Sequence, residues 1–110
     1  MEKKVWLGLL LDFYGQMLTQ NQRNLMELYC QEDFSLSEIA QLQDISRQGV
    51  HDTLIRAEKQ LLEMEEQLHL ASRYTRLQQG LQELEHDLLQ HGLDEYATRI
   101  GTLRKEWESP

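Results

Sequence analysis

Side chains with the chemistry to read DNA are concentrated in one short stretch of this chain, between Ser46 and Lys59. Arginine and lysine bind phosphates, while arginine, glutamine and aspartate also hydrogen-bond to base edges in the major groove. If the stretch is helical and these side chains face outward, it has the character of a DNA-reading helix. The candidate DNA-contacting residues are Ser46, Arg47, Gln48, His51, Asp52, Arg56 and Lys59.

Apolar residues recur every three or four positions through the same stretch, which is the spacing of one face of an α-helix. Ser46 precedes the first of them, and a serine hydroxyl is a favoured N-cap. The sequence therefore predicts a helix that begins after Ser46 and buries a continuous stripe while its polar residues face elsewhere. The stripe consists of Val50, Leu54, Ala57 and Leu61.

A second capped helix is predicted immediately before this one. Ser35 and Glu38 have the spacing of a capping box, in which both side chains accept hydrogen bonds from backbone amides at the helix start. Asp44 stands at the turn, where glycine is common because the backbone often needs positive φ. Gln43 replaces the usual apolar turn residue, so we expect Leu42 to close the turn against the core. The two helices together predict a helix-turn-helix.

The charge of the chain argues against strong non-specific binding to nucleic acid. The formal net charge is -8, and residues 19–59 hold seven acidic and four basic side chains. Duplex binding normally depends on lysine and arginine neutralising several phosphates. A capped helix pair also commonly serves packing alone, so the pattern leaves both interpretations open. We therefore expect any DNA contact to be modest, to depend on a dimer, or to be assisted by another protein.

Two further helices are predicted on the N-terminal side. The first is expected over about residues 5–18, and Thr19 with Gln22 forms another capping box that starts the second. The polar residues 31–33 end that second helix. The apolar stripe expected on the first helix consists of Val5, Trp6, Leu9, Leu10, Phe13 and Met17.

The helical spacing of apolar residues continues into the C-terminal half but changes register once. The stripe that contains Leu54 runs to Ala71, and a helix break near residues 71–73, with Ser72 as the cap, explains the shift. The second series consists of Tyr74, Leu77, Leu81, Leu84 and Leu88.

One more helix is predicted near the C-terminus. His91 and Gly92 indicate a helix end, and Asp94 is expected to cap the last helix. The leucine stripes exceed what one small domain usually leaves exposed. We therefore expect a homodimer, while folding of these helices back onto the N-terminal domain stays open.

Other chemistries have little support in the sequence. Cys30 is the only cysteine, the histidines have no metal-ligand spacing, and no glycine-rich phosphate loop or supported nucleophile occurs. We therefore expect no enzymatic activity, no metal and no cofactor. Asp12 interrupts the apolar N-terminal stretch, and no run of about 18 apolar residues exists, so neither a signal peptide nor membrane insertion is expected.

Four motifs make the first half of the chain resemble a known family. The motifs D-F-Y (12–14), L-T-x-x-Q-R (18–23), D-F-S-L-S-E-I-A (33–40) and S-R-Q-x-V-x-D (46–52) together resemble the small YlxM-like proteins of Gram-positive bacteria. Those proteins are themselves similar to the helix-turn-helix region 4 of sigma factors. The resemblance covers about residues 9–62 and fades into generic helix beyond them.

The resemblance implies an all-α, cytoplasmic protein with a sigma region 4-like helix-turn-helix domain and a C-terminal helical extension. It also implies a role in the signal recognition particle pathway, with DNA binding inferred from the motif. Carried over residue by residue, the DNA-facing positions of sigma region 4 fall on Arg47, Gln48, His51, Asp52 and Arg56. Sigma factors are usually more basic here, and Asp52 would repel a phosphate although it suits a cytosine amino group.

We therefore expect a helix-turn-helix domain over residues 1–60 and a helical dimerisation or bracing segment over residues 61–110. Two alternative functions are expected of the whole chain. The first is that of a regulatory DNA-binding protein linked to the signal recognition particle pathway. The alternative is an adaptor that does not bind DNA and instead holds a protein or ribonucleoprotein component of that particle. The acidity of the chain favours the adaptor, because an acidic surface steers a basic partner toward it.

Overall fold

A computed structural model describes residues 1–107, and within them the chain is all-helical, as the sequence predicts. The chain divides into two compact units, the first comprising Met1–His69 and the second beginning at Leu70. The helices are α1 (Lys3–Tyr14), the 3-10 turn η1 (Gly15–Met17), α2 (Gln20–Cys30), α3 (Leu36–Gln43), α4 (Arg47–Leu68), α5 (Leu70–Gln90) and α6 (Asp94–Lys105).

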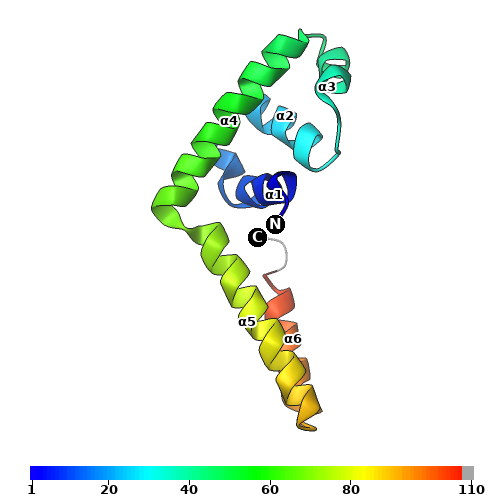
Figure 1. Cartoon of the computed structure of the whole chain (residues 1–110), viewed down its shortest axis with the longest axis vertical. Helices are drawn as coiled ribbons and strands as arrows, with labels where there is room; N and C mark the ends of the chain where they lie inside the picture. The colour runs from blue at the N-terminus through cyan, green and yellow to red at the C-terminus, as the bar shows by residue number, and fades with distance from the viewer. Residues whose placement is uncertain (108–110) are drawn as a thin grey trace. The chain divides into compact units, whose positions relative to one another are not determined.

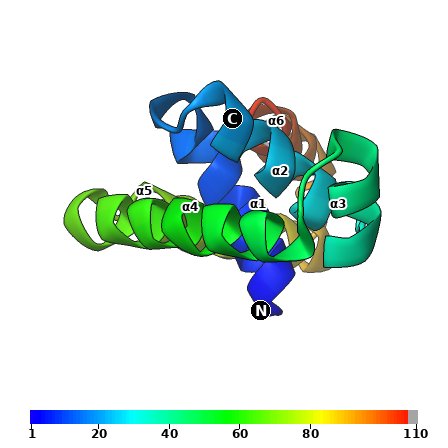
Figure 2. The ribbon, with the colours of Figure 1, turned by 90° about the horizontal axis from the view of Figure 1, so that it is seen from above.

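In the N-terminal unit, α1, α2 and α3 lie along one side of α4 (Figure 1), and α1 crosses α4 when seen from above (Figure 2). The predicted stripe on α4 is confirmed, because each of its four residues is at most 7% exposed. These side chains meet a complementary set from the other helices, so one continuous apolar core holds the unit together. That set includes Leu7, Leu10, Leu11, Leu25, Met26 and Ile39.

The stripe expected on the first helix is wrong in part. Val5 is 57% exposed and Met17 is 68% exposed, whereas Leu7, Leu11 and Tyr14 are buried with Leu10. The α-helix ends at Tyr14 and continues as a 3-10 turn, so the α-helical period no longer applies as far as Met17.

Three of the five predicted N-caps are confirmed. The capping boxes at Thr19 and Ser35 have both of their hydrogen bonds, and the Ser46 Oγ accepts from the Gly49 amide at 2.9 Å. These caps satisfy backbone donors that a helix cannot satisfy internally. They therefore fix where α2, α3 and α4 begin.

The turn between α3 and α4 contains the left-handed residue that the sequence indicates at Asp44, with φ of 54°. The Ile45 amide donates to the Ala40 carbonyl at 3.1 Å, which completes a Schellman-type end to α3. The expectation that Leu42 closes the turn is wrong, because that side chain is 59% exposed. Ile39, one helical turn earlier, is the fully buried residue of α3.

The helix break in the middle of the chain lies at His69, so the break expected near residues 71–73 is misplaced. His69 has φ of 57° and ends α4, while Ser72 lies inside α5 and is not a cap. The apolar register is a poor guide here because Glu65, rather than a leucine, takes the next buried position after Leu61. Helix α4 runs through the domain boundary expected between residues 60 and 61.

The second unit is an antiparallel pair of helices, α5 and α6, joined by a short turn in which Gly92 has φ of 72°. The Gln78 Nε2 donates to the Arg104 carbonyl at 3.3 Å, and Arg104 forms an ion pair with Glu85. Gly101 allows close approach, since a Cβ there would lie 2.6 Å from the Glu85 Oε1. Asp94 lies in the first turn of α6 and makes no cap, contrary to expectation, although a carboxylate there favours the helix dipole.

Tyr14 and Glu65 link α1 to α4 inside the first unit. The Tyr14 hydroxyl donates to the Glu65 Oε1 at 2.7 Å, and both residues are buried. Replacing Tyr14→Phe deletes this bond and should lower the free energy of unfolding by about 1–3 kcal/mol, measured by urea denaturation. Tyr29→Phe is the control, because no hydrogen bond of the Tyr29 hydroxyl is present in the described structure. Equal stability of the two variants would contradict this role.

Asp44 provides a second stability test. A β-branched side chain is strongly disfavoured in the left-handed region, so Asp44→Val should lower the free energy of unfolding by about 1–2 kcal/mol. Gln41→Val, at an exposed position within α3, should cost less than about 0.7 kcal/mol because only helix propensity changes. Thermal denaturation that ranks the two variants in the opposite order would show that this turn is not strained.

Candidate nucleic-acid interface

The candidate residues follow α4 from its N-cap through its first four turns. Ser46 is occupied as the cap, and Arg47, Gln48, His51, Arg56 and Lys59 are exposed, whereas Asp52 is half-exposed. At 100° per residue, Gln48, Asp52 and Lys59 lie opposite the buried stripe. The core thus fixes which side of α4 points away from the unit.

Three of the candidate side chains are joined to one another. The Gln48 Nε2 donates to the Asp52 Oδ1 at 2.8 Å, and the His51 Nδ1 lies 3.4 Å from the same oxygen. These contacts lower the pKa of Asp52, the Gln48 hydrogen bond contributing most and the His51 hydrogen bond next. Asp52 is therefore a carboxylate at neutral pH that orients its two neighbours.

This small network determines what each group can offer to DNA. With one amide hydrogen held by Asp52, Gln48 still has its carbonyl and second N–H for a base edge. Asp52 is an acceptor, suited to the amino group of cytosine or adenine and unsuited to phosphate. The N-terminal end of α4 therefore has the donors and acceptors for base readout but little positive charge.

The positively charged candidates are spread along the helix. Arg47 and Lys59 are twelve residues apart, or about 18 Å along an α-helix. A recognition helix in the major groove contacts bases mainly with its N-terminal residues. In that docking mode Arg47 would lie near a base or a nearby phosphate, and Arg56 and Lys59 would lie near the phosphate backbone.

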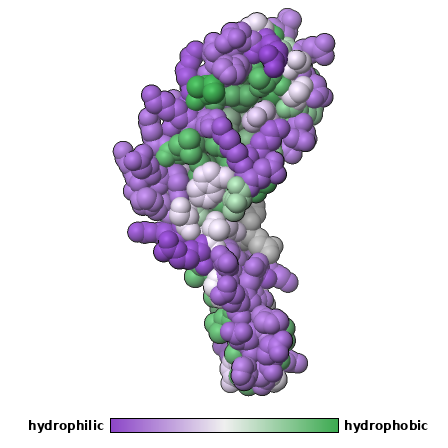
Figure 3. All heavy atoms as spheres, in the orientation of Figure 1, coloured by the Kyte–Doolittle hydropathy of each residue, from purple (hydrophilic) through white to green (hydrophobic). Residues whose placement is uncertain are grey.

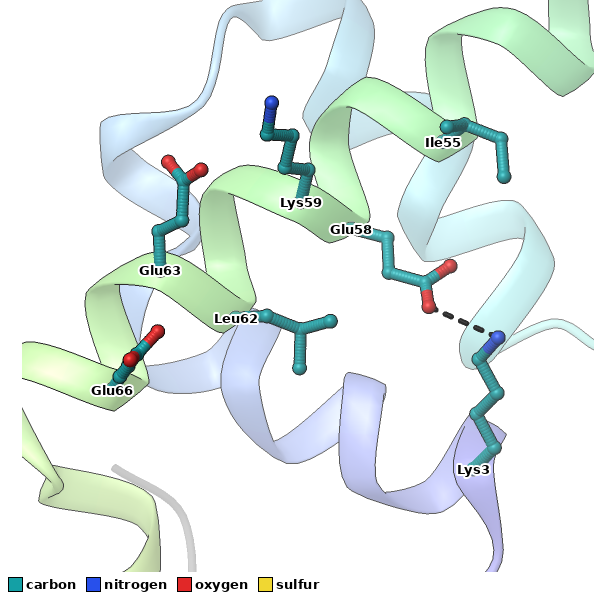
Figure 4. Close-up of a pocket in the computed structure, with 7 residues that line it drawn as sticks. All are labelled: Lys3, Ile55, Glu58, Lys59, Leu62, Glu63 and Glu66. Carbon is teal, nitrogen blue, oxygen red and sulfur yellow. Dashed lines mark ion pairs between the residues drawn. The ribbon is translucent and has the colours of Figure 1, made fainter.

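Sequence reasoning missed a surface farther along α4 (Figure 4). Ile55 and Leu62 are 51% and 42% exposed, and they line a hollow together with Lys3, Glu58, Lys59, Glu63 and Glu66. Lys3 of α1 pairs with Glu58 at 3.0 Å. A signal for this surface was present, because Ile55 and Leu62 lie seven residues apart and outside the buried stripe.

The N-terminal unit carries more negative than positive charge around this helix. Residues 1–69 hold twelve acidic and six basic side chains. The visible face of this unit is largely hydrophilic, with separate hydrophobic areas among the polar side chains (Figure 3). Long-range attraction to a polyanion is therefore weak, and recognition would depend on short-range contacts.

The described residues give no support to other kinds of site. Among residues 1–107, no three histidine, cysteine, aspartate or glutamate side chains are placed to share a metal ion. No helix in this part of the chain is long and apolar enough to cross a membrane. Cys30 is half-buried, and burial raises the pKa of its thiol to about 11, so the thiolate is scarce at neutral pH.

Comparison with known proteins agrees with the fold. Residues 1–99 match the family described as "Putative helix-turn-helix protein, YlxM / p13 like". A UPF0122 protein of Desulforamulus reducens is 47% identical over 78 residues, which cover 71% of this chain and 67% of the relative.

Two other relatives extend the comparison. A UPF0122 protein of Thermoanaerobacter is 48% identical over 80 residues, which cover 73% of this chain and 68% of that relative. The UPF0122 protein YofM of Lactococcus lactis is 43% identical over 95 residues, covering 86% of this chain and 83% of its own. With this extent of similarity and its capped α3–turn–α4 arrangement, the chain belongs to the YlxM/p13-like family of helix-turn-helix proteins.

Proposed function

We propose that this protein is a regulatory DNA-binding protein that reads a duplex with the N-terminal turns of α4. The observation that carries the proposal is that Arg47, Gln48 and His51 are exposed at the start of a helix whose apolar stripe is buried, with Gln48 opposite that stripe. A helix held in this way can enter the major groove without disturbing the core. Ser46 and Asp52 support the readout by fixing the helix start and the Gln48 side chain.

Binding through this surface should be weak for a single chain. The three positive side chains Arg47, Arg56 and Lys59 can neutralise few phosphates. We therefore include a homodimer in the proposal, because two linked helices reading two half-sites gain affinity that one helix lacks. The proposed regulatory role lies in the signal recognition particle pathway, in keeping with the family resemblance described above.

Arg47→Ala tests the readout. If Arg47 contacts a base, the variant should lose about 1–3 kcal/mol of binding free energy for duplexes that the wild-type chain selects from fragmented genomic DNA at low salt. Fluorescence anisotropy measures the loss, and affinity should also fall steeply as salt increases. Arg99→Ala removes the same charge from an exposed position on α6 and should bind as the wild-type chain does. Failure of the wild-type chain to select any fragment would refute DNA binding.

The acidity of the N-terminal unit supports a second candidate, an adaptor for a basic component of the signal recognition particle. Ile55 and Leu62 offer apolar contact, and Glu63 and Glu66 beside them offer negative charge (Figure 4). An amphipathic basic helix has the complementary chemistry, with charge steering association and apolar burial supplying affinity.

A pull-down with the tagged chain distinguishes this adaptor from the DNA-binding protein. Retention of particle components should fall several-fold for the double variant Glu63→Lys and Glu66→Lys, because opposite charges become like charges. Glu32→Lys changes the charge at an exposed position elsewhere in the unit and is the control. Recovery of no particle component by the wild-type chain would exclude the adaptor.

A further inference from the structure

The α5–α6 hairpin has one face that is apolar and open. Four residues of α5, and three of α6 together with one residue just beyond its end, follow the same spacing of four, three and four, so two apolar columns run side by side. Leu77, Leu103 and Trp107 are 58%, 61% and 60% exposed, and they line a hollow between the helices. Single exposed leucines are ordinary, but an organised double column is typical of an interface. The columns are Leu77, Leu81, Leu84 and Leu88 on α5, and Tyr96, Ile100 and Leu103 on α6 with Trp107 just after it.

The charges beside the α5 column change sign at its centre. Gln78 and Glu85, which follow column leucines, face α6, so the residues that precede Tyr74 and the column leucines lie on the opposite, outer flank. That flank begins with positive side chains and ends with negative ones. None of the four charged side chains on this flank has a hydrogen bond or ion pair in the part of the chain that the structure describes. They are Arg73, Arg76, Glu83 and Asp87.

Gly80 lies midway between the two charge types on the same flank. A helix with glycine in its interior is less stable than the same helix with alanine there. A Cβ at Gly80 would meet no atom within 4 Å, so no neighbouring group in the described chain requires this residue to be small. Close approach of another helix would explain a glycine at this position.

We propose that the outer flank of α5 is the contact between two copies of this chain, packed antiparallel about a two-fold axis at Gly80. In that arrangement Arg76 of each copy faces Glu83 of the other. Arg73 faces Asp87 in the same way, because residues 73 and 87 are symmetric about residue 80 and residues 76 and 83 are symmetric about the point between residues 79 and 80. The α5 leucine columns of the two copies then border the glycine contact, and each α6 lies on the far side of its own α5.

A second copy fits this surface better than a different protein does. A two-fold interface must be complementary to itself, so each positive residue requires a negative residue at the mirrored position. The order positive, glycine, negative meets that condition along a single helix. A parallel packing of two copies would instead place like charges together at both ends.

Charge reversal tests the pairing in the full-length chain by analytical ultracentrifugation. Arg76→Glu alone and Glu83→Lys alone should each raise the dimer dissociation constant roughly tenfold, because each creates two symmetric like-charge contacts. The double variant should return close to the wild-type constant. Lys105→Glu, at an exposed position on α6 outside the columns, is the matched control and should have little effect.

Gly80→Leu tests the close approach independently. It should weaken the dimer about tenfold or more by overpacking, while circular dichroism shows helix content maintained or increased. Gln79→Leu, on the adjacent exposed position, should leave the dimer intact.

Three results would overturn the proposal. They are a wild-type chain that is monomeric at micromolar concentration, a double charge variant that stays as weak as the single ones, and a Gly80→Leu dimer as tight as the wild type. Because the proposal concerns α5 alone, a dimer that fails to bind DNA overturns the DNA-binding function and leaves this interface standing.

Discussion

Burial of one face of α4 is the constraint on which the structure depends. Val50, Leu54, Ala57 and Leu61 are fixed against α1, α2 and α3, so the rotation of α4 about its own axis is not free. The polar residues of its first turns are exposed for that reason, and not because of any preference of their own. The same burial holds α4 in a single orientation. Because the unit has little positive charge, this fixed surface must recognise a partner by short-range contacts.

The helix caps and the turn at Asp44 define where the exposed surface of α4 begins. Ser35 and Ser46 start α3 and α4, and the left-handed Asp44 ends α3 between them. Together they place the start of α4 at the edge of the unit, where the Gln48, His51 and Asp52 network lies. Low positive charge then limits what the surface can do alone, which is why a second copy is part of the proposed function.

Much of the fold could be predicted from sequence because capping residues and apolar periodicity are local signals. The three caps, the stripe on α4 and the turn at Asp44 were all predicted on this basis. The helix break was predicted near residues 71–73 rather than at His69, because the apolar pattern continues through Leu68, whereas Glu65 is buried and Leu68 is 46% exposed. The hollow beside Ile55 and Leu62 includes Lys3 from α1, and only the tertiary structure brings α1 to that place.

The central claim is that α4 presents its first turns to a duplex while its apolar face stays in the core. Amide chemical shifts of the isotopically labelled full-length chain, followed by NMR during titration with a selected duplex, test it most directly. We predict progressive changes at residues 46–52, with Val50 and Leu54 methyl signals keeping their core contacts. Changes confined to other helices, with residues 46–52 unaffected by a duplex that binds, would contradict the claim.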